Sequence, residues 1–222
     1  MKRVNSMDIA ALVLWLLPVA YVAYIYSSLP ASVPVHFDID GKADRYGSRG
    51  EFLALQGVLM GTSALVYLLL KFLPAIDPKK YVKYGEVTFQ KLALGLVLFL
   101  TALDIAIAYA TVNNSFDVGK LILPVVGLLF AFIGNVMNSI KPNYFAGVRT
   151  PWTLEDPDTW RSTHRLASKL WFFGGIGLTI AVLLLPNKVG MIVFLSIVAI
   201  LVLIPVIYSY LYYKKHHPSN QN

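Results

Sequence analysis

Long apolar runs dominate this sequence and restrict the folds that it can adopt. Charged residues make up only 14% of the chain, whereas soluble domains carry about 25%. Six runs are almost free of charge: Ile9–Val35, Phe52–Leu70, Leu92–Phe116, Leu121–Ile140, Leu170–Asn187 and Val189–Tyr213. Each is close to the roughly 20 residues that a helix needs to cross a bilayer, and a helix satisfies its own backbone hydrogen bonds in lipid. We therefore predict an all-α integral membrane protein with six transmembrane helices.

Proline, glycine and charged residues indicate where these helices begin and end. The expected helices are about Asp8–Ser28, Glu51–Leu73, Lys91–Val112, Lys120–Ile140, Leu166–Leu185 and Gly190–Tyr213. We treat residues 1–222 as a single polytopic membrane domain, with an amino-terminal two-helix module (1–90) and a four-helix part (91–222). Asp156 and Pro157 form a typical helix start. They predict a short interfacial helix in the loop between helices four and five, which runs into helix five.

Basic residues are distributed unevenly between the two sides of the predicted bundle. With Met1 in the cytoplasm, the opposite side keeps only five of the 19 Lys and Arg residues: Lys42, Arg45, Arg49, Lys120 and Lys188. This positive-inside bias predicts a multi-pass plasma membrane protein with both termini cytoplasmic. Topology and contact with membrane lipids account for the net charge of +7, so no nucleic-acid partner is expected. The absence of cysteine excludes disulfides and thiolate chemistry.

The richest polar segment connects helices four and five. Arg149, Thr150, Pro151 and Trp152 place a guanidinium at the membrane surface beside a turn and an indole. These residues can anchor a protein partner. Alternatively, they hold the loop at the lipid boundary through phosphate and headgroup contacts.

A second group of candidate partner-binding residues follows in the same loop. Arg161, His164 and Arg165 recur at spacings of three and four, which places them on one face of a helix. Trp160 lies beside them and suits the headgroup layer, where an apolar ring and a polar N–H are both accommodated. This face can meet a cytoplasmic partner, or it is simply a polar face at the membrane interface.

The loop also resembles a known family. Its motifs are KPNYF at 141–145, RTPWTL at 149–154 and Thr163-His164, together with Gly134, Asn135, Gly147 and Trp160. They closely resemble the SdpI family of membrane immunity proteins against a secreted sporulation-delaying toxin. The outer PVHF motif at 34–37, with Gly41, Asp44, Tyr46 and Gly47, resembles the family's amino-terminal module of unknown function.

The resemblance implies a function and two kinds of partner. It implies an immunity protein that meets a membrane-active peptide toxin on the outer side. In the best-known case, toxin sensing also leads to capture of a transcriptional repressor at the inner membrane face. We expect no enzymatic activity and no cofactor.

Three polar residues lie within the predicted helices. Asn135 and Asn138 share a face of helix four and are expected to hydrogen-bond to a neighbouring helix, with a polar lining for a ligand as the alternative. Asp104 lies 13 residues after Lys91, about 20 Å along its helix and so near mid-membrane. An acid at that depth is a candidate proton or ion site. A small transporter or channel is therefore the alternative function.

The predicted outer loop carries His36, Phe37, Asp38, Asp40 and Asp44. In an extended segment His36, Asp38 and Asp40 project to one side. An imidazole and two carboxylates in that arrangement can hold a divalent cation. Their spacing matches no strong metal motif. We therefore prefer a hydrogen-bonded loop that packs Phe37 on the helix ends, with no metal. A metal-binding membrane enzyme is the least favoured alternative.

Overall fold

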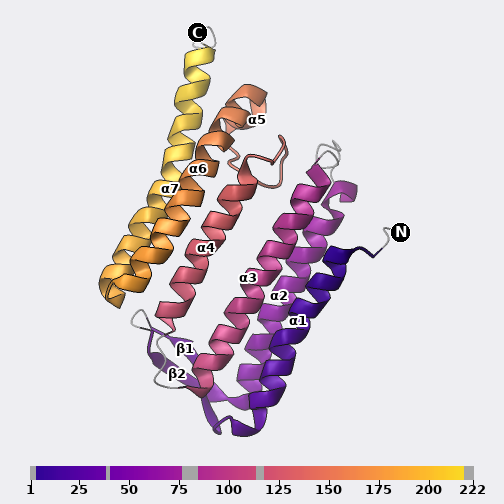
Figure 1. Ribbon diagram of the computed structural model, residues 1–222, viewed down its shortest axis with the longest axis vertical. Helices are drawn as coiled ribbons and strands as arrows, with labels where there is room; N and C mark the ends of the chain where they lie inside the picture. Colours follow the sequence, from indigo (N-terminus) through magenta and orange to yellow (C-terminus); the bar gives the residue numbers. More distant parts are fainter. Residues whose placement is uncertain (1–3, 39–40, 77–84, 114–117, 218–222) are drawn as a thin grey trace.

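Six long helices and a β-hairpin make up the computed structural model (Figure 1), which describes residues 4–38, 41–76, 85–113 and 118–217. The long helices are α1 (Ser6–Ile25), α2 (Arg49–Ile76), α3 (Glu86–Val112), α4 (Gly119–Met137), α6 (Pro157–Leu184) and α7 (Asn187–His216). A single 3-10 turn, Tyr26–Ser28, extends α1. All six long helices have the length and apolar composition of a membrane span. The prediction of an all-α membrane protein with six spans is confirmed.

The long helices form two groups of three that meet where α3 contacts α4 (Figure 1). One group is α1, α2 and α3, and the other is α4, α6 and α7. The most extensive contact joins α4 and α6, where glycines face the neighbouring backbone. A side-chain carbon at Gly134 would collide with the backbone of Phe172, and one at Gly175 would collide with the backbone of Ala131. Glycine therefore allows these two helices to pack in backbone contact, as small residues commonly do in membranes.

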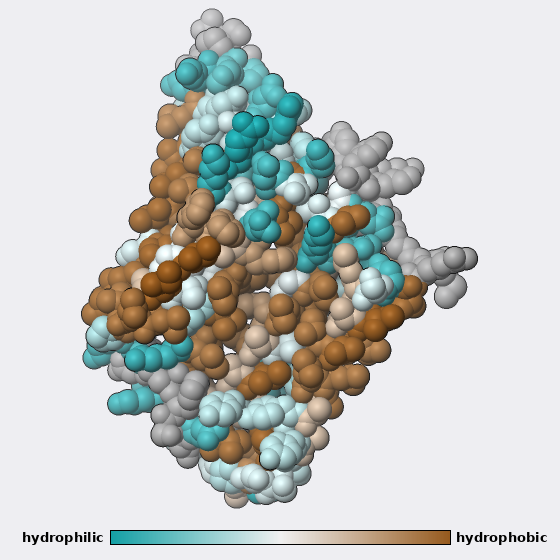
Figure 2. Space-filling model, in the orientation of Figure 1, coloured by the Kyte–Doolittle hydropathy of each residue, from teal (hydrophilic) through white to brown (hydrophobic). Residues whose placement is uncertain are grey.

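The two ends of the bundle carry different structures. Both termini lie toward one end, together with the short helix α5 (Pro151–Glu155), and the hairpin lies at the other end (Figure 1). We call these the termini end and the hairpin end. Hydrophobic residues cover the sides of the helices between them, and hydrophilic residues gather at the termini end (Figure 2). Among the exposed apolar side chains are Val58, Ile192 and Leu184. An apolar surface of this extent is suited to contact with lipid.

The start of α6 follows the predicted capping signal. The Asp156 carboxylate accepts hydrogen bonds from the amides of Asp158 and Thr159, at 3.2 and 2.8 Å. The helix therefore begins at Pro157, nine residues before the Leu166 that we predicted for the start of the span. The expected interfacial segment is continuous with the fifth span, as predicted, and α5 precedes it as a separate single turn.

The predicted outer loop contains an antiparallel hairpin that the sequence analysis did not foresee. Strand β1 (Ser32–Phe37) pairs with β2 (Ala43–Ser48), from Ser32 opposite Ser48 to Phe37 opposite Ala43. The connecting turn includes Gly41, whose φ of 76° favours glycine.

The hairpin is attached to the ends of α1 and α2. Val33 is buried in one apolar cluster with Leu29 and Phe52. The Arg49 guanidinium donates to the carbonyl oxygens of Leu29 and Pro30. These contacts fix the strands against the first two spans.

Candidate functional site

The loop between α4 and α6 folds over the first turns of α6, with His164 at its centre. His164 is only 1% exposed, and its ring stacks on Trp160 with 4.1 Å between ring centres. Its Nδ1 lies 2.9 Å from the Trp160 carbonyl oxygen, and its Nε2 lies 3.2 Å from the amide nitrogen of Val148. Because a carbonyl only accepts and an amide only donates, this network assigns the neutral tautomer with the proton on Nδ1. His164 therefore joins the loop to the helix.

Gly147 and Asn143 shape the loop around this histidine. Gly147 has a φ of 112°, which an L side chain rarely adopts, and a side-chain carbon there would collide with His164 Nε2. The buried side chain of Asn143 exchanges four hydrogen bonds of 2.7–3.1 Å with the backbone of residues 141–146. The KPNYF turn is therefore held by its own asparagine.

The RTPWTL motif folds as a capped turn of helix that packs on α7. Thr150 and Thr153 each accept the other's backbone amide, at 3.2 and 2.9 Å. The Thr150 hydroxyl also lies 3.0 Å from the hydroxyl of Ser209. Trp152 packs against Tyr210, with 4.9 Å between the ring centres. The motif is therefore a structural joint between the loop and the last span.

The structure separates the eight residues that we expected to bind a partner. Thr150, Trp160 and His164 are buried, Trp152 is half-buried, and Arg149, Pro151, Arg161 and Arg165 are exposed. Of the predicted face of Arg161, His164 and Arg165, only the two arginines are accessible to a partner, because the loop covers the side of α6 that carries His164. The predicted contact of Trp160 with lipid headgroups is not available either, because its side chain is buried and its Nε1 donates to the Ile140 carbonyl oxygen, at 2.9 Å.

Two of the exposed arginines already have partners. Arg149 donates to the carbonyl oxygen of Tyr144 at 2.6 Å, and Arg161 pairs with Asp158 at 2.7 Å. Arg165 makes neither a hydrogen bond nor an ion pair with any residue that the structure describes. Of the predicted set, Arg165 is therefore the side chain most available to another molecule.

The cap of α6 also changes the acidity of its carboxyl. Burial by itself would raise the pKa of Asp156, but hydrogen bonds from the Thr159 hydroxyl and amide and from the Asp158 amide stabilise the charged form. The net effect lowers the pKa below its ordinary value. Asp156 is therefore a carboxylate at neutral pH, which suits a helix N-terminus.

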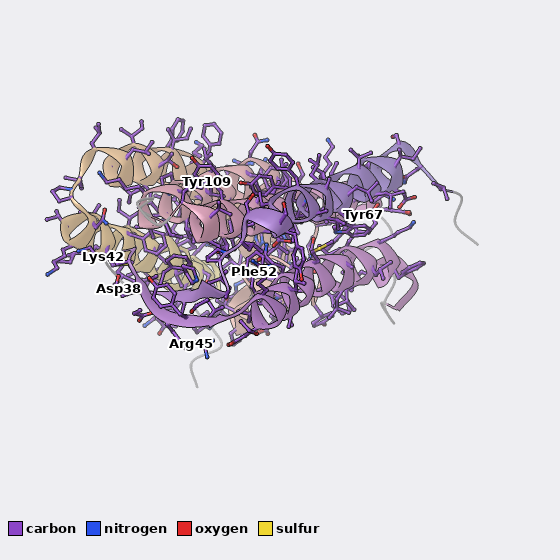
Figure 3. The ribbon with its side chains drawn as sticks, turned by 90° about the horizontal axis from the view of Figure 1, so that it is seen from below. Asp38, Lys42, Arg45, Phe52, Tyr67 and Tyr109 are labelled. Atoms are coloured by element: carbon purple, nitrogen blue, oxygen red, sulfur yellow. The ribbon has the colours of Figure 1, made fainter. Side chains whose placement is uncertain are left out.

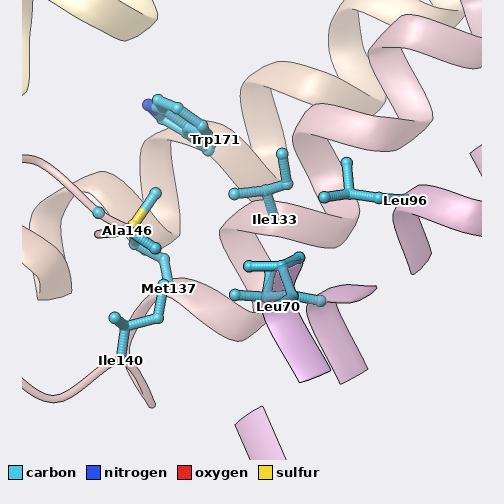
Figure 4. A pocket seen from close by; sticks show the side chains of 9 residues that line it. Leu70, Leu96, Ile133, Met137, Ile140, Ala146 and Trp171 are labelled. Atoms are coloured by element: carbon cyan, nitrogen blue, oxygen red, sulfur yellow. The ribbon is translucent and has the colours of Figure 1, made fainter. Parts of the chain in front are cut away.

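An apolar cavity of about 190 Å³ lies beneath the loop (Figure 4). Leu70 from α2, Met137 from α4 and Trp171 from α6 line it together with Ala146 and Gly147 of the loop. The loop therefore covers the place where the two helix groups come together at the termini end.

The hairpin end carries the other predicted cluster (Figure 3). His36 Nδ1 lies 2.6 Å from Asp44 Oδ1, and the Asp38 carboxylate accepts the amide of Lys42 at 2.9 Å. Phe37 is half-buried, and Asp40 lies outside the described residues. No three metal-ligating side chains converge in the part of the hairpin that the structure describes. The exposed polar residues of this cluster hydrogen-bond within the hairpin.

Comparison with known proteins shows what this chain resembles. Residues 139–209 match the SdpI/YfhL protein family. The chain is also 29% identical over 196 residues to the immunity protein SdpI of Bacillus subtilis (strain 168), covering 86% of this chain and 88% of that protein. The chain is thus similar to the SdpI/YfhL family in its carboxy-terminal third and to the immunity protein SdpI over most of its length. Together with the six apolar helices, this similarity identifies a multi-pass plasma membrane protein.

Two further comparisons each cover a part of this chain. Residues 13–60 match a domain of unknown function (DUF1648), which includes the hairpin and parts of α1 and α2. An uncharacterized protein of Archaeoglobus fulgidus is 41% identical over 69 residues, covering 31% of this chain and 34% of that protein. No solved structure matches. The SdpI/YfhL match contains the His164 site, α5 and most of α6 and α7.

Asp104 lies in neither matched region. It is 2% exposed in α3, and its Oδ1 has no hydrogen-bond partner among the residues that the structure describes. Nearby, the buried Gln56 side chain donates to the Asp104 carbonyl oxygen at 3.2 Å. Asp104, which we predicted to lie near mid-membrane, is therefore a buried carboxyl where α3 packs against α2.

Asn135 and Asn138 are both exposed. The expected hydrogen bonds from these side chains to a neighbouring helix are absent from the described part of the chain. The α4–α6 hydrogen bond in this region comes instead from the Ser168 hydroxyl, which donates to the Gly134 carbonyl oxygen at 2.7 Å.

The sequence analysis missed a charged cluster near the termini end of the bundle. Asp8 Oδ1 accepts hydrogen bonds from Tyr67 Oη and Lys71 Nζ, each at 2.6 Å. The Asp8–Lys71 pair is largely buried, with side-chain exposures of 12% and 17%. It joins α1 to α2. The sequence does contain a signal for this pair. Asp8 directly precedes the first apolar run and Lys71 directly follows the second, and two consecutive antiparallel spans bring these positions to the same end of the bundle.

Proposed function

We propose that this protein is a membrane immunity protein that protects its cell against a secreted, membrane-active peptide toxin. The observation that carries this proposal is the similarity to the immunity protein SdpI over most of both chains. Similarity of that extent is not limited to the carboxy-terminal region that matches the family.

The proposal includes an orientation. Lys and Arg gather in the segments that the structure brings to the termini end, including Lys141, Arg149, Arg161, Arg165 and Lys214. The positive-inside bias places that end in the cytoplasm and the hairpin end outside. A secreted toxin would then meet the hairpin first.

The hairpin end offers apolar surface for an amphipathic peptide. Tyr46 on β2 is 54% exposed, and Tyr24 on α1 is 81% exposed. Close to the hairpin, a cavity of about 310 Å³ opens between α1 and α2, lined by Val22, Tyr26 and Leu53 among others. A peptide that lays its apolar face along such a groove uses a common mode of helix recognition. We propose that the toxin binds there.

Cell survival tests this proposal. Expression of the chain in toxin-sensitive cells is expected to raise the toxin concentration that stops growth. Tyr46→Ala should reduce the protection, whereas Tyr144→Ala, which alters an exposed tyrosine at the opposite end, should preserve it. Loss of protection in the second variant alone, at equal membrane levels of both, would contradict a toxin site at the hairpin end.

Signalling to a cytoplasmic repressor is the finer part of the proposal. Phe145 and Leu154 of the termini-end loop and Arg165 of α6 are exposed. Aromatic, aliphatic and arginine side chains of this kind commonly anchor protein interfaces. A photoreactive side chain at Phe145 should crosslink to a DNA-binding protein only in toxin-treated cells. Crosslinking to no protein under either condition would remove the signalling role and leave immunity intact.

A second candidate function rests on Asp104. A buried carboxyl with an unpaired oxygen in a membrane helix is a typical feature of a proton or ion path. In reconstituted vesicles, a transporter should lose its ion flux with Asp104→Asn while the protein stays folded. Equal flux in both proteins would exclude this function.

A further inference from the structure

A groove runs along the contact between the two helix groups, starting at the termini end. Its first part is a cavity of about 620 Å³ between α1, α3 and α4, with Val13, Leu94 and Leu98 among its apolar walls. A second cavity of about 310 Å³ shares Gly95, Leu98 and Phe132 with the first and continues along α3 and α4. The two cavities therefore adjoin each other along α3 and α4, and together we call them the groove. Figure 2 shows the bundle hollowed between its halves, with hydrophobic residues around the hollow.

The groove has the length of one leaflet of the membrane. It extends along α3 from Lys91 to Ala102, eleven residues apart. At 1.5 Å per residue this is about 16 Å, close to half of the roughly 30 Å hydrocarbon core. A single acyl chain has to cross the same depth. The apolar part of the groove therefore fits a lipid tail.

Polar groups occupy one end of the groove. Lys91 from α3 and Asn135 from α4 line the first cavity near the termini end and are both exposed. Neither side chain forms a hydrogen bond or an ion pair with another residue in the described ranges. An amide without a partner is unfavourable at the edge of the hydrocarbon region, so an external acceptor would stabilise Asn135. Because the Lys91 ammonium is positively charged, an anionic acceptor is favoured over a neutral one.

Gly95 allows the groove walls to come together without filling it. A side-chain carbon at Gly95 would collide with the ring of Phe132. The ring therefore lies directly against α3, where it forms a wall common to both cavities.

We propose that this groove binds an anionic phospholipid from the leaflet at the termini end. The acyl chain lies between α1, α3 and α4, and the phosphate accepts hydrogen bonds from Lys91 and Asn135. Basic pockets between transmembrane helices bind anionic headgroups in this way. The bound lipid fills the space between the two helix groups and contributes to their packing. The site is separate from the toxin site proposed at the hairpin end.

Native mass spectrometry of the full chain tests the proposal. The probes are phosphatidylglycerol and phosphatidylcholine with identical acyl chains. The unaltered protein should retain one phosphatidylglycerol in preference to phosphatidylcholine. Lys91→Gln should weaken the phosphatidylglycerol complex about fivefold, the effect of one basic residue near the membrane surface, and leave phosphatidylcholine unaffected. The matched control Lys169→Gln removes a lysine from α6 that does not line the groove and should bind as the unaltered protein does.

A second pair of variants tests the acyl chain. Leu98 and Leu195 are similarly exposed, at 55% and 59%, but only Leu98 lines the groove. Leu98→Trp should fill the groove and abolish retention of the lipid, whereas Leu195→Trp should not. Val13→Trp gives an independent block from α1, should Leu98→Trp not fold.

Three results would overturn the proposal. The first is equal weakening by Lys91→Gln and Lys169→Gln, which indicates attraction to the general charge of the surface. The second is full retention of lipid in both folded groove variants. The third is complete displacement of phosphatidylglycerol by inorganic phosphate, which indicates an anion site without an acyl chain.

Discussion

Replacement of Gly147 by alanine should destabilise the termini-end loop selectively. The φ of 112° places this residue in the left-handed region, which disfavours an L side chain by about 1–2 kcal/mol. The new carbon would also displace His164 from the amide of Val148, 3.2 Å away. Loss of a buried hydrogen bond costs about 1–3 kcal/mol. The free energy of unfolding should therefore fall by about 2–5 kcal/mol for Gly147→Ala.

Reversible unfolding in detergent, followed by tryptophan fluorescence, measures this change because Trp160 stacks on His164. Gly177→Ala is the matched control. A side-chain carbon at Gly177 meets nothing within 4 Å, and alanine in a helix interior is favoured over glycine by about 0.5–1 kcal/mol. The control should therefore be neutral or slightly stabilising. A Gly147→Ala protein as stable as the unaltered chain would refute the assignment of Gly147 and His164 as the joint of the loop.

The remaining predictions concern charged groups at the termini end. Lys71→Met should destabilise the protein by about 3–5 kcal/mol because it leaves Asp8 buried without its cation, and adding Asp8→Asn should recover much of the loss in a double-mutant cycle. A purely additive cycle would show that the pair does not interact. The pKa of Asp156 is lower in the folded protein than its unfolded value of about 3.9. The stability that its carboxylate contributes is therefore complete above about pH 3.9 and is lost as the pH falls through the folded pKa. Melting temperatures between pH 6 and pH 3 should thus fall less for Asp156→Asn than for the unaltered protein, and equal falls would contradict the cap.

The spans could be predicted because lipid imposes a simple requirement on the chain. Any run of about 20 apolar residues must satisfy its own backbone, so length and charge alone locate the helices. The start of α6 was equally accessible, since Asp156 and Pro157 act on their immediate neighbours. Residue spacing and local capping therefore determine most of the fold.

Long-range contacts account for what the sequence analysis missed. The spacing of Arg161, His164 and Arg165 places them on neighbouring positions of a helix, but only the returning loop decides which of them is covered. Gly147 carries part of that information, because a glycine inside a polar loop indicates a close approach. The partner at that approach, His164 Nε2, lies 17 residues away and cannot be read from the pattern.

The hairpin was missed for a different reason. Val33, Val35 and Phe37 occupy alternate positions with Pro34 and His36 between them, and a glycine turn follows, which is a recognised strand signal. The run is short and contains Pro34, so the segment was predicted as a loop. The hairpin also rests on Leu29, Phe52 and Arg49, which lie at the ends of the adjoining spans.

The most direct test of the proposed function asks whether the hairpin end faces outward and receives the toxin. The chain has no cysteine, so single substitutions can be labelled in intact cells with a membrane-impermeant maleimide. Tyr46→Cys should react in intact cells and become protected when toxin is added, whereas Arg161→Cys should react only after permeabilisation. Reaction of Arg161→Cys in intact cells, with Tyr46→Cys inaccessible, would contradict the account.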